Sequence, residues 1–596
     1  MIDELTDAIL SKRLKRIPYA VSDYRRLRQE NCYYVDKTPY IPLVEAAPFY
    51  LFSIRPRRFG KSLWLTVLRD YYDINRADEF DFLFGDTYIG QHPTAEHSSY
   101  LTMFINFAMV DPAPHRVEES FHRNGCTEVE SFLTRYKRFF TPEFIARITA
   151  LENVTEQLRR MLDYATRNDL KIYLFIDEYD NFTNTILSTA GEQAYYAITR
   201  GEGFFRHFFN LLKGATGGQI AGLKRLYLTG VSPVTMDDVT SGFNIGTNIS
   251  LDSRFNEMIG FTEAEVTEML GYYHETGWLR LPIADTLDVM REWYNNYRFG
   301  QETETPMFNS DMVLFFLNAA RERTKLPLEL IDQNVRIDYN KLRHLMAMDS
   351  RLNGNFSELK RIVEEGETRS LINPSFPLDQ LLNRENFISL LYYFGLISIV
   401  GIEDGKPQLR IPNRTIKDLM YGYLRSAFAD VNVFKLDMLT LSRLLSDMAY
   451  RGEWKGFFNY LTENIREQAS VRDHLNGEKV IQGFLLAYLN INHDFLTWSE
   501  REMGGGFVDL YLEPFLPRYP DVKYGYLIEL EYISNKQYNQ KEFDKSLQKE
   551  IAEAEAQLRQ YASDSRIQQM AQRVTLKKLV LVYKGWELVY AAEVEQ

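Results

Sequence analysis

Short apolar runs in the first half of the chain predict buried β-strands. They lie at residues 49–54, 101–107, 171–177 and 223–231. Apolar runs of this length, without regular polar alternation, are typical of parallel strands that are covered on both faces. The first run leads through a short basic loop into a second apolar segment, Leu63 to Leu68, which suits a helix. Residues 126–169 also look helical, so the pattern predicts an α/β core with a parallel sheet.

Two further regions follow this core. The pattern of residues 261–345 predicts several helices. Thr262 is a residue type preferred at a helix N-cap, and the acids that follow it are favourable in a first turn. Residues 375–428 read as a helix, a short hairpin and a second helix, which predicts a winged-helix-like unit. No basic recognition helix is evident there, so this unit favours packing over DNA binding.

A second α/β unit begins near residue 476. Its first helix starts near Glu478, and Gly504 to Gly506 predict a tight turn between strands. The remaining predicted elements are strands at 495–499, 507–512 and 524–533, a charged helix at 541–562 and a hairpin at 576–591. The chain of 596 residues is long enough for about three to four domains.

Composition indicates a globular protein. Of its residues, 45% are hydrophobic and 14% are aromatic, which argues against long disordered tracts. No stretch approaches the roughly 18 apolar residues of a membrane span, and the acidic N-terminus lacks a signal-peptide pattern. Cys32 and Cys126 cannot alone form a disulfide framework or a zinc site. We therefore expect a cytoplasmic protein without a membrane partner, and the oligomeric state stays open.

Net charge limits the expected partners. The formal charge is −13, so a uniformly acidic surface would repel nucleic acid. Any contact with DNA or RNA therefore needs a local basic patch.

The first strand–helix junction carries Gly60-Lys61-Ser62. A helix N-terminus offers unpaired N–H groups and a partial positive charge, which bind phosphate. Lys61 would reach the β- and γ-phosphates of a nucleotide such as ATP, and the Ser62 hydroxyl would ligate Mg²⁺. The full phosphate-loop pattern has a glycine where this chain has Arg55. The alternative interpretation is an ordinary strand-to-helix turn that happens to contain Gly-Lys-Ser.

Three arginines surround this loop, and the preceding segment can also contribute. Arg55, Arg57 and Arg58 add positive charge that can face a triphosphate, and Pro56 fixes one backbone angle. Residues 12–48 are an extension that we expect to pack on the first strand. A role in covering the nucleotide base stays open for it.

Carboxylates follow the strand at 171–177. Asp177 would hold Mg²⁺ and Glu178 would orient the attacking water, as in a Walker B strand, with Asp180 as the next candidate. Carboxyl ends of parallel strands are where α/β sheets bind ligands. At the end of the next strand, Thr229 is the first candidate sensor of the γ-phosphate and Ser232 the second. A strand running into a turn explains these two residues equally well.

Several of these motifs together resemble those of AAA-ATPase-like proteins, which are common in gut bacteria and their relatives. The similar stretches are residues 17–24, 34–38, 57–62, 175–180, 228–234, 255–263, 293–299 and 411–413. In that family an arginine usually stands at the position of Arg55. The resemblance implies an ATPase core, a helical middle and a C-terminal nuclease-like domain of the PD-(D/E)xK type.

The resulting domain prediction has four parts. They are an N-terminal segment and ATPase core at 1–255, a helical lid at 256–345, a winged-helix-like middle at 346–470 and a nuclease-like domain at 471–596. Arg298 of the lid could supply a cation to the phosphates, although an ordinary surface role suits it better.

Asp509 and Glu529 fall on successive strands of the C-terminal unit. Paired carboxylates can share a divalent metal, Mg²⁺ or Mn²⁺, that activates water against a phosphodiester. This arrangement resembles PD-(D/E)xK nucleases. The same resemblance implies roles for Glu478, an additional acid on the preceding helix, and for Gln557 and Tyr561, which match a Gln-x-x-x-Tyr element on one helix face.

Glu531 departs from the nuclease pattern, which requires lysine at this position. The departure removes a cation that would stabilise developing negative charge, and like-charge repulsion raises the pKa of neighbouring acids. Lys523, Lys536 and Lys545 are the candidates for a substitute cation.

Three functions remain open at the level of sequence. The first is an ATP-hydrolysing protein that acts on nucleic acid, and the second is a nucleotide-regulated scaffold whose nuclease fold only binds. The third, a metal-dependent nuclease gated by its phosphate loop, is weakened by Glu531.

Overall fold

The structure, a computed structural model, describes residues 14–216, 222–240, 246–335, 355–430, 436–467, 478–533 and 540–594. The chain divides into two compact units. Unit 1 comprises Met1–Thr324, Glu329–Glu358 and Glu367–Thr415, and unit 2 comprises Lys325–Leu328, Leu359–Gly366 and Ile416–Gln596. The boundary near Thr415 falls within the region 346–470, which the sequence analysis treated as one domain.

Unit 1 is built on a parallel sheet with the strand order β2-β3-β4-β1-β5. The strands are β1 (Tyr50–Ile54), β2 (Leu101–Asn106), β3 (Ile172–Asp177), β4 (Leu223–Gly230) and β5 (Thr247–Asn248). The first four coincide with the predicted apolar runs, and the prediction of a parallel sheet is confirmed. Every residue of β3 is buried, as expected for a strand covered on both faces.

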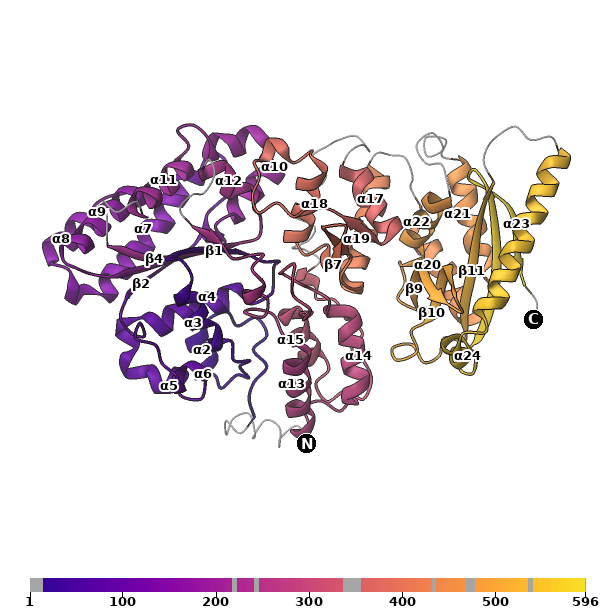
Figure 1. The fold of residues 1–596 in the computed structure, drawn as a ribbon, viewed down its shortest axis with the longest axis horizontal. Coiled ribbons are helices and arrows are strands. Elements are labelled where there is room, and N and C mark those ends of the chain that lie inside the picture. The colour runs from indigo at the N-terminus through magenta and orange to yellow at the C-terminus, as the bar shows by residue number, and fades with distance from the viewer. Residues whose placement is uncertain are drawn as a thin grey trace. The chain divides into compact units, whose positions relative to one another are not determined.

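Helices lie on both sides of this sheet. In Figure 1, α2 to α5 lie on one side, and α7, α9, α11 and α12 lie on the other. Their bounds are α2 (Tyr24–Gln29), α3 (Ile41–Ala46), α4 (Lys61–Tyr72), α5 (Phe80–Phe84), α6 (Tyr88–Gln91), α7 (Val117–Arg135), α8 (Pro142–Thr149), α9 (Val154–Arg167), α10 (Asn181–Thr199, with a kink at Gly191), α11 (Phe204–Thr216) and α12 (Val234–Thr240).

Helix α4 places the phosphate-loop motif at the sheet. Its N-cap is Gly60, whose φ of 91° lies in the left-handed region that only glycine adopts without strain. Trp64, Leu65 and Leu68 are buried on the helix, which packs on β2 and β3. The chain therefore turns sharply from β1 into a helix whose first residues are Lys61 and Ser62.

The remainder of unit 1 covers most of the region predicted as a helical lid and the first part of the region predicted as winged-helix-like. Its elements are α13 (Glu263–Glu275), α14 (Ile283–Tyr294), α15 (Ser310–Ala319), α18 (Arg384–Tyr393), β6 (Glu367–Arg369), β7 (Ser398–Glu403) and β8 (Lys406–Arg410). The β7–β8 hairpin is present, and β6 extends it to a three-stranded sheet with the order β6-β8-β7. Helices α17 (Asn355–Glu365) and α19 (Arg414–Asp430) each contribute residues to both units.

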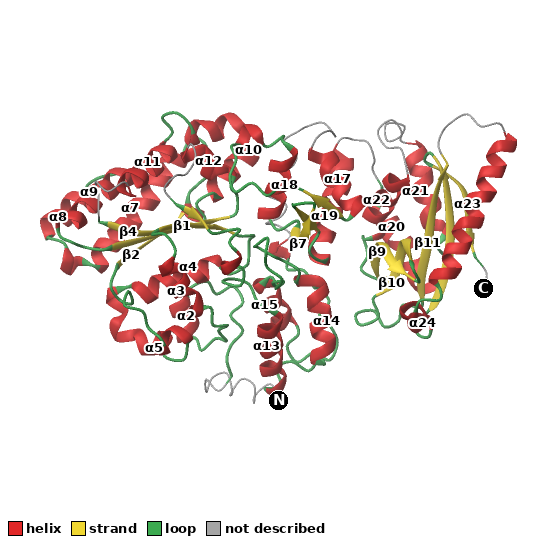
Figure 2. Ribbon diagram, in the orientation of Figure 1, coloured by secondary structure: helices red, strands yellow, loops and turns green. Residues whose placement is uncertain are grey.

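Unit 2 contains a mixed sheet with the order β13-β12-β11-β10-β9, which is drawn in yellow in Figure 2. Its elements are α20 (Met438–Arg451), α21 (Lys455–Glu467), α22 (Glu478–Leu489), β9 (Phe495–Met503), β10 (Gly506–Pro514), β11 (Tyr524–Ile533), α23 (Gln540–Tyr561), α24 (Ser565–Ala571), β12 (Thr575–Lys584) and β13 (Glu587–Glu593). Strands β10 and β11 are antiparallel, whereas β11 and β12 are parallel. The predicted second α/β unit is thus confirmed.

Candidate functional site

Lys61 lies buried at the junction of β1 and α4. Its ammonium donates hydrogen bonds to the carbonyl oxygens of Arg55 (3.1 Å) and Pro56 (2.9 Å). Burial lowers the pKa of Lys61 to about 8, although the carboxylates of Glu178 and Asp177 oppose this shift. The side chain therefore still carries a positive charge at neutral pH, at the position where the motif predicts a phosphate contact.

Asp177 ends β3 next to Ser62 and Lys61. Burial raises the pKa of Asp177 to about 6, and a hydrogen bond with the Ser62 side chain counteracts part of the shift. Its Oδ1 accepts a hydrogen bond from the Glu178 backbone N–H at 3.0 Å. Its Oδ2 is buried and has no hydrogen-bond partner among the described residues. A hydroxyl and a carboxylate with an unsatisfied oxygen are hard donors that fit Mg²⁺.

Glu178 has a strained backbone. Its φ is 50°, a left-handed conformation that costs a non-glycine residue about 1–2 kcal/mol. The Oε2 atom accepts a hydrogen bond from Asn181 Nδ2 at 2.8 Å, and both residues line the same cavity. Strain of this kind persists where the surroundings impose it, and such positions cluster at functional sites.

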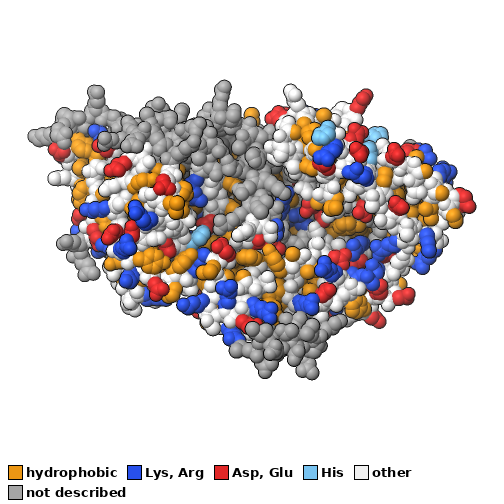
Figure 3. Space-filling view, turned by 180° about the vertical axis from the view of Figure 1, so that it is seen from behind, with side chains coloured by type: hydrophobic (Ala, Val, Ile, Leu, Met, Phe, Trp, Pro, Cys, Tyr) orange, Lys and Arg blue, Asp and Glu red, His pale blue; other side chains and the backbone are white. Residues whose placement is uncertain are grey.

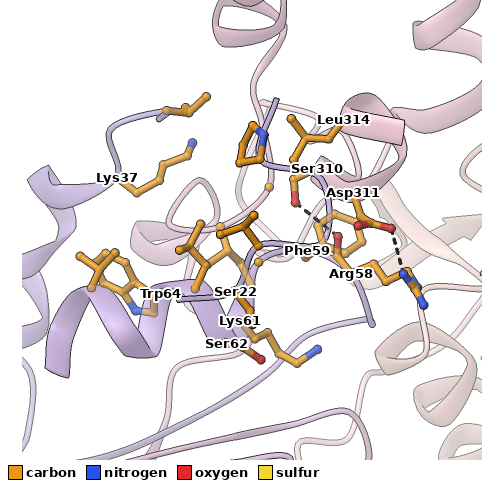
Figure 4. Close-up of a pocket in the computed structure, with 18 of the residues that line it drawn as sticks. Ser22, Lys37, Arg58, Phe59, Lys61, Ser62, Trp64, Ser310, Asp311 and Leu314 are labelled. Atoms are coloured by element: carbon orange, nitrogen blue, oxygen red, sulfur yellow. Dashed lines mark hydrogen bonds and ion pairs between the residues drawn. The ribbon is translucent and has the colours of Figure 1, made fainter. Parts of the chain in front are cut away.

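Arg57 and Arg58 line this cavity beside the loop. Arg58, whose φ is 68°, forms an ion pair with Asp311 of α15 at 3.0 Å. Its backbone oxygen also accepts hydrogen bonds from the Asp311 N–H (3.2 Å) and the Ser310 hydroxyl (3.3 Å). Figure 4 shows these contacts between the loop and the start of α15. The loop is therefore fixed to the helices that were predicted as a lid.

Arg55 does not face the cavity, in contrast to the expectation from sequence. Its buried guanidinium donates to the backbone oxygens of Ile54, Ser250 and Phe255 and lies 4.5 Å from the centre of the Phe299 ring. The expected contact with phosphates is corrected to a structural one, because Arg55 holds the segment after β5 against the end of β1.

The candidate sensors also have structural partners. The Thr229 hydroxyl donates to the backbone oxygen of Ser53 at 3.0 Å, and Thr229 does not line the cavity. Asp180 accepts from the backbone N–H groups of Val231 and Ser232, and so ties the end of β4 to the start of α10. The Ser232 hydroxyl oxygen accepts a hydrogen bond from the Val234 N–H at 3.3 Å, and Ser232 does not line the cavity either. Neither candidate sensor therefore faces the cavity, in contrast to the expectation from sequence.

Arg298 lies away from the cavity as well. Its backbone N–H donates to Ser398 Oγ at 2.8 Å, and its Nη1 donates to the Val400 oxygen at 3.0 Å. Arg298 thus joins the segment after α14 to β7 instead of supplying a cation to the loop.

The cavity has a volume of about 480 Å³, and its lining combines polar and apolar side chains. Lys61, Ser62, Glu178, Arg57 and Arg58 are among the polar lining residues. The apolar lining residues include Pro18, Val21, Leu27, Tyr33, Val35, Met258, Ile259, Phe261 and Leu314. This volume lies within the usual range for small-molecule sites, roughly 300–1,000 Å³. The N-terminal segment therefore contributes directly to the cavity.

Sequence reasoning missed several cavity residues. Lys37, Asn181 and Asp311 all line it. For Lys37 a signal was present, because it stands in the family-like stretch 34–38. For Asn181, which follows the acidic strand end, spacing alone gave no indication. Asp311 lies on α15, far from the loop in sequence, so only the tertiary fold reveals it.

Asp509 and Glu529 lie side by side in unit 2. Leu510 of β10 pairs with Ile528 of β11, which places the two acids opposite each other. The Asp509 N–H donates to Glu529 Oε1 at 3.4 Å, and Asp509 Oδ2 accepts from the Leu530 N–H at 2.8 Å. Burial and the adjacent Asp509 raise the pKa of Glu529 well above its ordinary value. The predicted carboxylate pair is present, and the raised pKa of Glu529 favours the protonated form of that carboxyl.

The other predicted nuclease-like residues are less well placed. Glu531 contributes negative charge that further raises the pKa of Glu529. Within the described ranges, no group of three or more His, Cys, Asp or Glu side chains is arranged to hold a metal ion. Lys523 immediately precedes the first residue of β11, so about 20 Å of extended strand separates it from Glu529. Lys545 is exposed on α23, and Lys536 lies outside the described residues.

Of the nuclease-like residues predicted on helices, Tyr561 packs in unit 2 and Gln557 does not. Tyr561 is buried, and its hydroxyl donates to the Phe507 oxygen at 2.9 Å, whereas Gln557 is exposed. Glu478 begins α22, but its side chain lies outside the described part of the chain. Sequence reasoning did not predict Gln482 of α22, whose Nε2 donates to the Asp509 backbone oxygen at 2.8 Å.

The fold and the site together define the class of the protein: a parallel α/β unit with a Gly-Lys-Ser loop, followed by a smaller mixed α/β unit. Comparison with known families gives the particular domains. Residues 18–240 match the family described as a predicted AAA-ATPase, and residues 476–593 match the PD-(D/E)XK nuclease superfamily. The chain thus contains an AAA-ATPase-like domain and a nuclease-superfamily domain.

Individual relatives are more distant. A protein of Azotobacter chroococcum mcd 1, described as an uncharacterized protein in the vnfD 5′ region, is 24% identical over 312 residues, or 51% of this chain. The match spans only 52% of that relative's length. The ORC2 protein of Aeropyrum pernix in its ADPNP-ADP complexes is similar at 11% identity, with 66% of this chain and 93% of that one covered and a TM-score of 0.31.

None of the helices in the described ranges combines the length and the apolar character that a bilayer span requires.

Proposed function

We propose that unit 1 binds ATP with Mg²⁺ and hydrolyses it. One observation carries the proposal: Lys61, Ser62, Asp177 and Glu178 converge beside a cavity whose lining also includes many apolar side chains. A triphosphate matches the polar groups, and an aromatic base matches the apolar surface.

Each residue has a defined task in this proposal. Lys61 would leave the two loop carbonyls and contact the β- and γ-phosphates. Ser62 and Asp177 would hold Mg²⁺, which neutralises charge on the phosphates when bound. Glu178 would orient the attacking water, and Asn181 keeps the Glu178 carboxylate in place by its hydrogen bond of 2.8 Å.

The proposal extends to unit 2, where the nuclease-like domain would act on nucleic acid. The oxygens of Asp509 and Glu529 suit a hard cation such as Mg²⁺ or Mn²⁺. Because the raised pKa of Glu529 favours its protonated form, metal binding would have to displace that proton. Basic and acidic side chains are mixed across the face shown in Figure 3. Binding of nucleic acid is therefore to be measured directly.

A second candidate function is a nucleotide-regulated scaffold or signalling protein whose nuclease-like domain only binds. Glu531 favours this candidate because it replaces the expected lysine with a further negative charge beside Glu529. Both candidates share ATP binding in unit 1, and they differ in whether unit 2 cleaves.

The test combines binding and cleavage on the full chain. Mg-ATP at about 100 times its Kd should stabilise wild type by about 2.7 kcal/mol, and Lys61→Ala should lose most of this stabilisation. Lys213→Ala, on α11 in the same unit, serves as the control because Lys213 is not part of the cavity. Equal stabilisation of wild type and Lys61→Ala would contradict the assignment. Mn²⁺-dependent cleavage of single- or double-stranded DNA that is lost in Asp509→Ala would select the nuclease over the scaffold.

A further inference from the structure

Lys37 is a buried lysine that lines the cavity away from the phosphate loop. Only 8% of the residue is exposed. Figure 4 shows the Lys37 side chain apart from those of Lys61 and Ser62. Burial of an ammonium group is costly unless it is paired, so its presence in this cavity requires an explanation.

The ammonium of Lys37 is held by one carboxylate. Lys37 Nζ lies 2.6 Å from Oε1 and 2.8 Å from Oε2 of Glu265. Glu265 is fixed in turn by the capping box of α13: its Oε2 accepts from the Thr262 N–H at 2.7 Å, and its N–H donates to Thr262 Oγ1 at 3.3 Å. Both partners of the ion pair therefore have defined positions.

One donor of the ammonium is left over in this arrangement. A lysine ammonium has three N–H donors, and the two oxygens of Glu265 account for two of them. Among the described residues, Glu265 is the hydrogen-bond partner of Lys37 Nζ. The remaining N–H can serve an acceptor in the cavity that Lys37 lines.

The surroundings indicate what that acceptor is. Tyr33, Val35, Ile259, Phe261 and Leu314 contribute apolar surface to the cavity. The other charged lining residues lie on the phosphate loop, on α15 or after β3, and they are Arg57, Arg58, Lys61, Glu178 and Asp311. A flat heterocycle with ring nitrogens combines an aromatic surface, which suits this apolar lining, with an acceptor for the remaining N–H of Lys37.

We propose that Lys37 takes part in recognition of the base by donating a hydrogen bond to a ring nitrogen of adenine. The inference rests on ATP binding at Lys61, as proposed above. N1, N3 and N7 of adenine are acceptors, whereas its exocyclic amino group is a donor and cannot accept this bond. Glu265 acts on the base only through Lys37 and is a positioning residue.

A purely structural role for the ion pair predicts a different result. If Lys37 only ties the N-terminal segment to α13, its removal changes the binding of all nucleotides in the same proportion. If Lys37 contacts the base, its removal changes the ratio between ATP and an analogue that lacks one ring nitrogen.

The experiment measures the Kd of ATP, 1-deaza-ATP, 3-deaza-ATP and 7-deaza-ATP for the full chain with Mg²⁺. Wild type should bind one of the three analogues about tenfold more weakly than ATP, because a charged hydrogen bond is lost. Lys37→Met should bind ATP and that analogue equally well. Lys15→Met is the matched control, since Lys15 lies in the same segment, near the Tyr33 ring, but does not line the cavity; it should keep the wild-type ratio.

Each outcome bears on a different part of the argument. Equal affinity of wild type for all four nucleotides would overturn the inference without any variant, so it stays testable if Lys37→Met does not fold. The same tenfold ratio in wild type and Lys37→Met would overturn it as well. Failure of wild type to bind ATP would overturn the proposed function itself, and the inference with it.

Discussion

Asp177→Asn should change how the stability of unit 1 depends on pH. Burial raises the pKa of the Asp177 carboxyl from the usual value near 4 to about 6. The folded state therefore binds a proton more tightly than the unfolded state does. This contribution to stability is fully present below about pH 4 and is lost as the pH rises through about 6.

The size of the effect follows from this shift. At about 1.4 kcal/mol per pH unit, the difference between the two pKa values corresponds to about 3 kcal/mol. Asparagine does not titrate, and its oxygen can still accept the hydrogen bond from the Glu178 N–H. Relative to wild type, Asp177→Asn should gain up to about 3 kcal/mol between pH 4 and pH 8.

The free energy of unfolding of wild type and Asp177→Asn is measured by urea unfolding across this pH range. A chelator is present, and the signal follows unit 1 separately. Thr229→Val is the control, because Thr229 does not titrate and its hydroxyl donates to the backbone oxygen of Ser53 at 3.0 Å within the same sheet. Loss of that hydrogen bond should destabilise the protein by the same amount at every pH. Stability curves of wild type and Asp177→Asn that run parallel from pH 4 to pH 8 would refute the reasoning.

Three further predictions concern turnover and the second site. Glu178→Gln should retain Mg-ATP and lose about 10²–10⁴-fold in hydrolysis, because orientation of water matters in the transition state; unchanged phosphate release would exclude Glu178 from this role. The affinity of unit 2 for Mn²⁺ should rise with pH, because burial and Asp509 raise the pKa of Glu529 and the metal competes with the proton on that carboxyl; calorimetry showing no pH dependence would contradict this. Glu531→Lys should raise Mn²⁺-dependent DNA cleavage, and a variant that folds but cleaves no better than wild type would argue against a missing cation.

Local sequence patterns were sufficient to predict most strands of the main sheet of each unit and the turn into α4. The strands of unit 1 are continuous apolar runs, and Gly60 with its left-handed backbone marks the turn into α4. Asp509 and Glu529 could be paired in advance because they follow one another on neighbouring strands. The two-residue strand β5 escaped prediction because so short a segment has no hydrophobic pattern of its own.

Side-chain direction around the loop could not be predicted in this way. Arg55 and Arg58 stand three residues apart in the sequence, yet their side chains have different partners. The buried Arg55 guanidinium donates to the backbone oxygen of Phe255, whereas Arg58 forms an ion pair with Asp311 of α15. The difference depends on segments distant in sequence, such as Ser250 and Phe255. Lys37 was overlooked for the same reason, since its partner Glu265 is 228 residues away.

The hydrogen bonds of Lys61 to its own loop have a consequence for the affinity of nucleotide binding. Before the ammonium can contact phosphate, it must leave the carbonyl oxygens of Arg55 and Pro56. Hydrogen bonds to a charged group are worth about 1.5–3 kcal/mol each, so their loss offsets part of what the phosphate contacts contribute. The loop carbonyls are therefore internal competitors of the phosphates for the same ammonium group.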